Sequence, residues 1–594
     1  MTDLSLTPAT HAAASLPLVA AQPGIWMAEK LSDQVNAWSV AHYVDITSAA
    51  LDAPLLCEAI ATGMTQADTL RMRFDESDGI VTQRLDPGLT FETPAIVDVR
   101  HEADPQAAAL ARMRADLEQD LRVASGQPLA HHQLLRVGDT RWFWYQRYHH
   151  LVVDGFSFTA ITRRIADIYR SWHRGEDPGP SPFVAFNEVV EEYARYQASD
   201  ACARDAAFWA QQVRELPPPA TLSDKPLSGQ SSTTALIRRS LRFDEAHFAA
   251  LMASSGGLAA PDVALALVAL WLGRLSGRND YSAGFIFMRR IGSAALCATG
   301  PVLNVLPCPV RIDPSQTLAQ FAAAFAKTLK TLRRHQRYDA EQVLRDSGNV
   351  AQQTPLFGPV LNLKMFDYRL DFDGVEGVTH QLASGPVKDL EIALYVDEQG
   401  GVTLELLANQ QRYDAAQIER QLARLPRLLA QFAANPGLLC AQADLLGEED
   451  YALIARVNQT AMQLPQETLS SLLEKQAQAT PQAAALADDH YAFTYREMRE
   501  QVLTLAAELV RRGVAPGDVV AVALPRSVFL SLSLQAIVEV GAAWLPLDTG
   551  YPDDRLQMML EDARPALLIT AAQEQARFAG LDLPVFCYEA PLAV

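Results

Sequence analysis

The sequence predicts a multidomain protein of the α/β class. The chain has 594 residues, which is too long for one hydrophobic core and suggests roughly three or four domains. Hydrophobic residues make up 49% of the chain and charged residues 20%, as in globular rather than disordered proteins. Patterns typical of strands and of helices follow one another along the chain, which favours mixed α/β architecture.

Charge and apolar patterning exclude several classes of partner. The formal net charge of −20 argues against nucleic acid, because phosphate contacts need clustered Lys and Arg. The six cysteines show no C-x-x-C motif and no disulfide-like spacing, so we expect reduced thiols in a cytoplasmic protein. The N-terminus lacks a secretory signal. The longest apolar runs, 263–273 and 527–547, predict buried helices and no membrane span, since the second contains Gln535 and Glu539.

The main candidate site is the stretch 148–155, Tyr-His-His-Leu-Val-Val-Asp-Gly. Residues 141–148 are rich in aromatic side chains and predict a strand. Residues 158–173 have apolar side chains at helical spacing and predict an amphipathic helix. The stretch is therefore expected on the turn from a strand into a helix, where a rigid scaffold can hold a side chain with one face open to substrate.

The residue types in this stretch suit proton handling. Histidine has an ordinary pKa of about 6.5 and can accept and return a proton near neutral pH. Gly155 leaves a backbone N–H available as a donor, and Asp154 can hold the turn or pair with a distant cation. A packing or surface role for His149 and His150 stays open. A zinc site is disfavoured, because neighbouring strand residues point to opposite faces.

The pattern His-His-x-x-x-Asp-Gly resembles the active-site motif of the condensation domains of nonribosomal peptide synthetases, which are related to chloramphenicol acetyltransferase. The resemblance implies that His150 is catalytic and that Gly155 helps to stabilise the tetrahedral intermediate. It implies structural roles for His149 and Asp154. Weaker matches to other motifs of the family occur in the expected order: Gln22 with Trp26, 67–74, His335-Gln336 and Arg345-Asp346-Ser347.

The resemblance also implies the architecture. Two lobes with a chloramphenicol-acetyltransferase-like fold meet in a V, with a tunnel at their seam. The Pro/Gly-rich stretch 174–182 is the predicted boundary, which gives lobes 1–178 and 179–440. An arginine about 14 residues before Asn304, which the count places at Arg290 with Arg289 as the other possibility, is implied to pair with Asp154 across the lobes through a bidentate guanidinium. A solvated Arg289-Arg290 pair is the alternative.

A helix is predicted to start at Asp313-Pro314, because an acidic cap and a proline at the first position favour helix initiation. Its apolar face is ordinary core and consists of Leu318, Phe321, Phe325, Leu329 and Leu332. The helix ends in the basic cluster 333–337. This cluster could hold the phosphate of a phosphopantetheine arm, but we favour a solvated surface.

The last part of the chain resembles the start of an adenylation domain. Residues 441–465 are the expected linker, and 466–594 carry the matching motifs 493–498 and 541–548. A helix is predicted to end at Gly541, before a short strand and a Pro/Asp loop. The chain stops at Val594 before any Gly/Ser/Thr-rich phosphate loop. We therefore expect no acyl-adenylate formation here, with ATP and Mg²⁺ used only by a full-length protein.

The whole order of motifs is most similar to that of siderophore synthetases that activate serine. This implies a 2,3-dihydroxybenzoyl donor on a separate aryl or acyl carrier protein and a seryl acceptor on a peptidyl carrier domain. Both would be phosphopantetheine thioesters, with no cofactor or metal bound to this chain. An epimerising domain, a stand-alone acyltransferase and a carrier-docking module with inert histidines remain alternatives.

Overall fold

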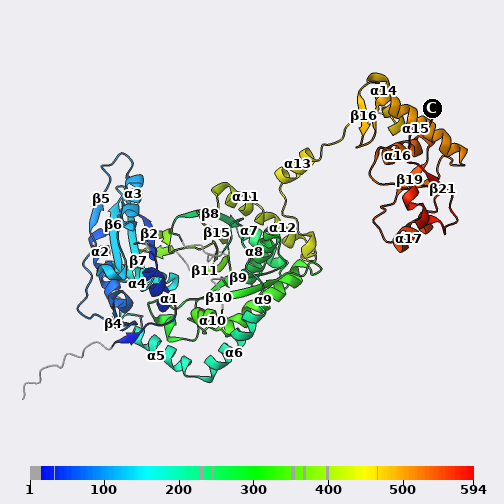
Figure 1. Cartoon of the computed structure of the whole chain (residues 1–594). Coiled ribbons are helices and arrows are strands. Elements are labelled where there is room, and N and C mark those ends of the chain that lie inside the picture. Colours follow the sequence, from blue (N-terminus) through cyan, green and yellow to red (C-terminus); the bar gives the residue numbers. More distant parts are fainter. Residues whose placement is uncertain are drawn as a thin grey trace, which may run out of the picture. The chain divides into compact units, whose positions relative to one another are not determined.

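The structure is a computed structural model that describes residues 15–32, 34–227, 233–243, 245–348, 355–364, 369–396, 401–464 and 466–593. The chain forms two compact units, residues 1–453 and 454–594 (Figure 1). Each unit has its own sheets and hydrophobic cores. The candidate site of the sequence lies in the first unit.

The first half of unit 1, here called lobe 1, is built on a six-stranded sheet of order β12-β13-β2-β7-β6-β5. Its strands are β2 (Ser39–Thr47), β5 (Ile96–Asp98), β6 (Ala130–Arg136), β7 (Arg141–His149), β12 (Arg369–Asp371) and β13 (Glu376–Ser384). Helices α2 (Ala53–Gln66) and α4 (Gly155–His173) share one hydrophobic core with this sheet. The predicted aromatic strand is thus confirmed as β7.

Lobe 2 is built on a second six-stranded sheet of order β10-β9-β11-β14-β15-β8. Its strands are β8 (Leu236–Phe243), β9 (Asp280–Phe287), β10 (Asn304–Arg311), β11 (Val360–Lys364), β14 (Leu390–Val396) and β15 (Val402–Asn409). Helices α8 (Ala260–Ser276), α9 (Leu318–Arg334) and α12 (Leu425–Ala434) contribute to its core. The apolar run 263–273 is buried throughout in α8, as predicted.

The remaining elements of this part of the chain surround the two sheets (Figure 1). They are β1 (Leu16–Pro17), α1 (Gln22–Lys30), β3 (Met72–Ser77), β4 (Ile80–Leu85), α3 (Pro105–Leu117), α5 (Phe186–Gln197), α6 (Asp200–Arg214), α7 (Glu245–Ala253), α10 (Ala340–Asp346) and α11 (Ala415–Leu422). The boundary between the two units falls within α13 (Glu448–Val457). Strands β1, β4 and β3 form a small separate sheet.

One segment of the chain returns from lobe 2 to the sheet of lobe 1. Strands β12 and β13 follow β11 of lobe 2 in sequence, but β13 pairs with β2 in lobe 1. A single domain boundary near residue 178 therefore does not enclose all strands of the first sheet, because residues 369–384 also belong to that sheet. The boundaries 1–178 and 179–440 remain a prediction, to which the structure adds this return.

Two helices start at positions other than those expected. Helix α4 begins at Gly155 rather than at residue 158, because the Asp154 carboxylate accepts the Ser157 N–H and caps the helix. Helix α9 begins at Leu318 rather than near residue 314, because Thr317 forms a capping box with Gln320. Asp313 instead closes a turn by accepting the Ser315 N–H. The predicted apolar face of α9 is buried.

Unit 2 contains a parallel sheet of order β19-β18-β20-β21 and a two-stranded sheet of β16 and β17. Its elements are α14 (Leu469–Ala479), β16 (Ala484–Ala487), β17 (Ala492–Thr494), α15 (Tyr495–Arg511), β18 (Val519–Ala523), α16 (Val528–Val540), β19 (Ala543–Pro546), α17 (Asp553–Ala563), β20 (Leu567–Thr570) and β21 (Val585–Cys587). Gly541 ends α16 with a left-handed φ of 82°, which confirms the predicted helix end.

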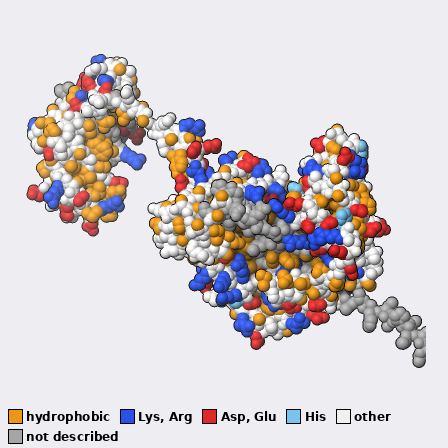
Figure 2. All heavy atoms as spheres, turned by 180° about the vertical axis from the view of Figure 1, so that it is seen from behind, with side chains coloured by type: hydrophobic (Ala, Val, Ile, Leu, Met, Phe, Trp, Pro, Cys, Tyr) orange, Lys and Arg blue, Asp and Glu red, His pale blue; other side chains and the backbone are white. Residues whose placement is uncertain are grey.

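No helix in the described ranges is long and apolar enough to cross a bilayer. The face in Figure 2 carries both Lys and Arg and Asp and Glu side chains.

Candidate active site

A cavity of about 120 Å³ lies where the two lobes meet. Lobe 1 supplies His150, Gly155 and residues of β2 to its wall. Lobe 2 supplies residues of β9, β11 and β14, among them Ile286 and Asn362. The motif of the sequence therefore opens onto a space that both lobes enclose.

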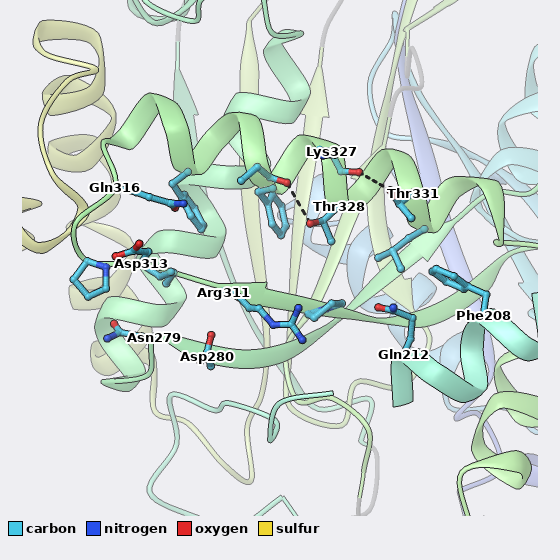
Figure 3. Close-up of a pocket in the computed structure, with 17 residues that line it drawn as sticks. Phe208, Gln212, Asn279, Asp280, Arg311, Asp313, Gln316, Lys327, Thr328 and Thr331 are labelled. Atoms are coloured by element: carbon cyan, nitrogen blue, oxygen red, sulfur yellow. Dashed lines mark hydrogen bonds between the residues drawn. The ribbon is translucent and has the colours of Figure 1, made fainter. Parts of the chain in front are cut away.

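A larger hollow, of about 670 Å³, lies elsewhere in lobe 2 (Figure 3). Its lining includes Phe208 of α6, Arg311 of β10 and Thr328 of α9, and it contains none of the predicted site residues. The hydroxyls of Thr328 and Thr331 donate to carbonyls of their own helix, as the dashed lines in Figure 3 show. The larger volume thus does not identify the reaction site. The side chains that line each cavity do, and only the smaller cavity is lined by His150 and Gly155.

The His150 ring is held in a defined tautomer. Its Nδ1 lies 2.9 Å from the carbonyl oxygen of Val153, and since a carbonyl only accepts, Nδ1 carries the proton. Burial lowers the pKa of His150, although Asp154 and nearby backbone groups oppose part of that effect. The ring is therefore neutral near pH 7, and its Nε2 has a lone pair for a ligand in the cavity. Trp38 accepts the His150 backbone N–H at 2.8 Å.

His149 has a different environment from its neighbour. It is 2% exposed, and its Nδ1 accepts the Leu151 N–H at 3.0 Å. Its Nε2 therefore carries the proton and lies 2.6 Å from a carboxylate oxygen of Glu29 on α1. The two adjacent histidines thus have separate partners. The sequence did not predict this role for Glu29. The one available signal was its position in the matching stretch that begins at Gln22.

Asp154 and Arg290 form the predicted ion pair across the lobes. One nitrogen of Arg290, Nη2, lies 2.7 Å from each carboxylate oxygen of Asp154, and both side chains are at most 3% exposed. The pairing is not the expected two-nitrogen fork, because Nη1 donates instead to the carbonyls of Ala295 and Ala298. Burial acts to raise the pKa of Asp154, but the charge of Arg290 and backbone hydrogen bonds hold it below its usual range.

Asp154 thereby connects three structural features. It caps α4, pairs with Arg290, and accepts the Val302 N–H at 3.1 Å. The aromatic ring of Phe156 lies 4.5 Å from the guanidinium carbon of Arg290, a cation–π distance. The loop of lobe 2 that carries Val302 is thus fixed against the start of α4.

Gly155 is the first residue of α4, is exposed and lines the cavity. The first N–H groups of a helix have no acceptor within the helix, and the positive end of the helix dipole lies there. The start of α4 therefore presents donor groups and partial positive charge to the cavity that holds His150. Such a position suits a developing oxyanion.

Gln22 of the first matching motif supports the histidine turn from behind. Its side-chain amide donates to the Leu151 carbonyl at 3.3 Å and to Gln83 at 2.9 Å. The Asn304 side chain donates to the carbonyls of Gln336 and Tyr338, so the start of β10 is joined to the matching stretch at His335-Gln336. The cationic side chains of the cluster 333–337 include Arg337, which pairs with Glu192 at 2.6 Å.

Comparisons with known sequences agree with this architecture. A family model for the condensation domain matches residues 12–455, and a model for the AMP-binding enzyme matches residues 473–585. Enterobactin synthase component F of Escherichia coli (strain K12) is 59% identical over 97% of this chain, and the match covers 45% of that protein. The dimodular nonribosomal peptide synthase of Bacillus subtilis (strain 168) is 32% identical over 94% of this chain and 23% of its own length. The chain spans less than half the length of these curated relatives.

Solved structures give the same result for the fold. A mutant starter condensation domain of rhizomide synthetase RzmA, in complex with C8-CoA and Leu-SNAC, has a TM-score of 0.65 and 29% identity, and the match covers 73% of this chain and 98% of that one. The first condensation domain of the calcium-dependent antibiotic synthetase, in complex with a substrate analogue, has a TM-score of 0.66 and 25% identity over 73% of this chain and 100% of that one. The chain therefore belongs to the condensation-domain family of nonribosomal peptide synthetases, which are amide-forming enzymes, and continues into the start of an AMP-binding enzyme domain.

Proposed function

We propose that unit 1 joins a carrier-bound acyl thioester to the amino group of a carrier-bound aminoacyl thioester. One observation carries the proposal: the neutral ring of His150, with its Nε2 lone pair, faces a cavity between the lobes beside the N-terminus of α4. A lone-pair acceptor and a helix N-terminus are the two groups that amine attack on a thioester needs.

The reaction forms a carbon–nitrogen bond and breaks a carbon–sulfur bond. The amine nitrogen attacks the thioester carbonyl, and the Gly155 N–H donates to the oxygen on which negative charge develops. His150 Nε2 accepts a hydrogen bond from an N–H of the amine. This bond orients the amine and stabilises the positive charge that develops on its nitrogen. The thiolate then leaves and takes up the proton that the amine loses. The free amine titrates near pH 8, so a strong base is not required.

The other motif residues have positioning roles in this proposal. His149, held by Glu29, fixes the end of β7. Asp154 and Arg290 hold α4 against lobe 2, so that Gly155 keeps its place on the cavity wall. Residues 441–465 have the role of a linker between the condensation domain and the adenylation-type part of the chain in this proposal.

We infer that the donor is 2,3-dihydroxybenzoyl on an aryl carrier protein and that the acceptor is seryl on a peptidyl carrier domain. The similarity to enterobactin synthase component F, at 59% identity, supports this pairing and a place in siderophore biosynthesis. Both substrates would arrive as phosphopantetheine thioesters, so the chain needs no bound cofactor of its own. All six cysteines are free thiols, which favours the reducing cytoplasm.

The test is amide formation between separately loaded carriers in the presence of this chain. We expect His150→Ala to lower the rate about 100-fold or more, the lower end of the contribution of a proton-handling group. His173→Ala is the matched control, because that histidine pairs with Asp373 on the surface and lies outside the cavity lining. A His150→Ala chain that melts normally and retains the full rate would refute the proposal.

A further inference from the structure

The cavity beside His150 has a second, polar part. His42 of β2 lines it and is 5% exposed, yet its Nδ1 is buried and has no hydrogen-bond partner among the described residues. The same holds for the hydroxyl oxygen of Ser384 at the end of β13. An unpaired buried polar atom destabilises the fold, because it has lost its hydrogen bonds to water without replacement. Two such atoms on one cavity wall indicate a place kept for a ligand that can pair with them.

Strand pairing places these two residues along one direction away from the histidine motif. In the β2–β7 ladder Ser39 stands opposite His149, and His42 is three residues further along β2, about 10 Å at strand spacing. In the β2–β13 ladder Ser384 stands opposite Val40. Ser384 therefore lies nearer the histidine motif, and His42 lies further from it along β2.

The lobe 2 wall of the same cavity is charged but internally paired. The Lys364 ammonium donates to the Tyr395 hydroxyl at 2.9 Å and lies 4.0 Å from Glu391. Asn362 donates to Glu391 at 2.8 Å. Burial lowers the pKa of Lys364, and Glu391 opposes that effect. These groups supply a polar surface that needs no further ion and can hydrogen-bond to neutral hydroxyls.

Aromatic and apolar side chains complete the wall. The His42 ring stacks on Phe158, with 3.9 Å between ring centroids and 17° between planes. Burial, with added repulsion from Lys364 and Arg238, lowers the pKa of His42 well below its usual value, so the stacked ring is neutral. Ile286, Met288 and Leu303 line the same cavity. His42 and Gln381 also line an adjoining hollow of about 550 Å³, so the wall continues past His42.

We infer that His42 and Ser384, opposite Lys364, form a subsite that recognises the hydroxyl groups of an aromatic acyl donor. The inference deepens the proposed function and rests on it. Flat aromatic and apolar side chains suit a ring, and the two unpaired polar atoms match two hydroxyls rather than the single hydroxyl of a seryl group. A site built to pair with a hydroxyl rejects an analogue that lacks it, because its buried polar groups then remain unpaired.

The test compares two donors on the same aryl carrier protein, 2,3-dihydroxybenzoyl and benzoyl, with this chain and a seryl-loaded peptidyl carrier. The measurement is the kcat/KM for the 2,3-dihydroxybenzoyl donor divided by the kcat/KM for the benzoyl donor. We expect His42→Leu to lower the ratio about tenfold or more and Ser384→Ala to lower it severalfold. His42→Asn, which keeps a hydrogen-bonding side chain, should restore most of the ratio.

The matched control is Thr328→Val in the larger hollow of Figure 3, which also removes one hydroxyl but lies outside this cavity. It should leave the ratio unchanged, and the preference for seryl over alanyl acceptors should not change in any variant. The inference is overturned if His42→Leu and Ser384→Ala melt normally and keep the parent ratio of kcat/KM for the two donors. It is also overturned if the variants lose rate equally with both donors, or if they change only the preference for seryl over alanyl acceptors. If His42→Leu does not fold, Ser384→Ala and His42→Asn decide by the same criteria. A parent chain that makes no amide from either donor would instead refute the proposed function.

Discussion

The turn from β7 into α4 in lobe 1 has a counterpart in the turn from β15 into α11 in lobe 2. Strands β2-β7-β6-β5 and β8-β15-β14-β11 have the same order and the same senses of pairing, two antiparallel and one parallel. In each turn an aspartate five residues after the last strand residue, Asp154 or Asp414, caps the following helix. The same local structure therefore occurs twice in unit 1.

The two turns differ in what surrounds the cap. Asp154 is buried and pairs with an arginine of the other lobe, whereas Asp414 is exposed and its carboxylate accepts the Gln417 N–H. The second turn has a buried ion pair too, but Arg412 and Asp389 both belong to lobe 2. Where the first turn has His150, the second has Gln410. The strand–turn–helix unit is therefore scaffold, and contact with the opposite lobe distinguishes the copy that carries the candidate chemistry.

The largest expected effect separates the two caps. Asn caps helices as well as Asp does, so Asp414→Asn should change the free energy of unfolding by only a few tenths of a kcal/mol. Asp154→Asn should cost about 3 to 5 kcal/mol, because it leaves Arg290 buried without a counter-charge. Urea unfolding of both variants measures the difference. Equal stability of both, with turnover lost only in Asp154→Asn, would assign Asp154 to catalysis instead.

A second, smaller effect is the pH dependence of the difference in free energy of unfolding between the parent and Asp154→Asn. The folded pKa of Asp154 lies below the ordinary value of about 3.9, so its ionised form stabilises the fold. This contribution is complete above about pH 4 and is lost as the pH falls through the folded pKa. The stability gap between the parent and Asp154→Asn should therefore be constant from pH 7 to pH 5 and narrow below pH 4. A gap that widens on acidification would contradict the sign of the shift.

The smallest effect concerns the capping box. The Ser157 hydroxyl oxygen accepts the Asp154 backbone N–H at 2.8 Å and completes a capping box, whereas the matching Gln417 side chain of α11 donates to the Leu222 carbonyl. Ser157→Ala should cost about 1 kcal/mol, as the loss of one capping hydrogen bond does. Gln417→Ala, at the matching position of α11, is the control and should cost less. Thermal unfolding of the two variants measures both, and the reverse order would show that the box adds nothing to α4.

Much of the candidate site was readable from local sequence. The strand–turn–helix around His150 followed from aromatic density and helical periodicity, and the start of α4 was missed by one turn because Asp154 was assigned to the loop instead of the cap. The Asp154–Arg290 pair was predicted only through family resemblance, since no local rule joins residues so far apart in the chain.

The polar wall around His42 could not be predicted. His42 and Ser384 lie on strands whose alternation reads as ordinary half-buried sheet, and they meet only because β13 pairs with β2. Register between distant strands is set by the whole core and not by the strands' own residues. The return of residues 369–384 to lobe 1 was missed for the same reason.

The return of residues 369–384 to lobe 1 also affects the order in which the protein folds during synthesis. Until residues 369–384 emerge, β2 is the edge of an incomplete sheet, with unpaired backbone groups open to association. Lobe 1 therefore finishes folding only after most of lobe 2 has been translated. A chimeric synthetase that imports residues 1–178 alone would borrow its last two strands from the host, whereas a graft that carries 369–384 along brings its own.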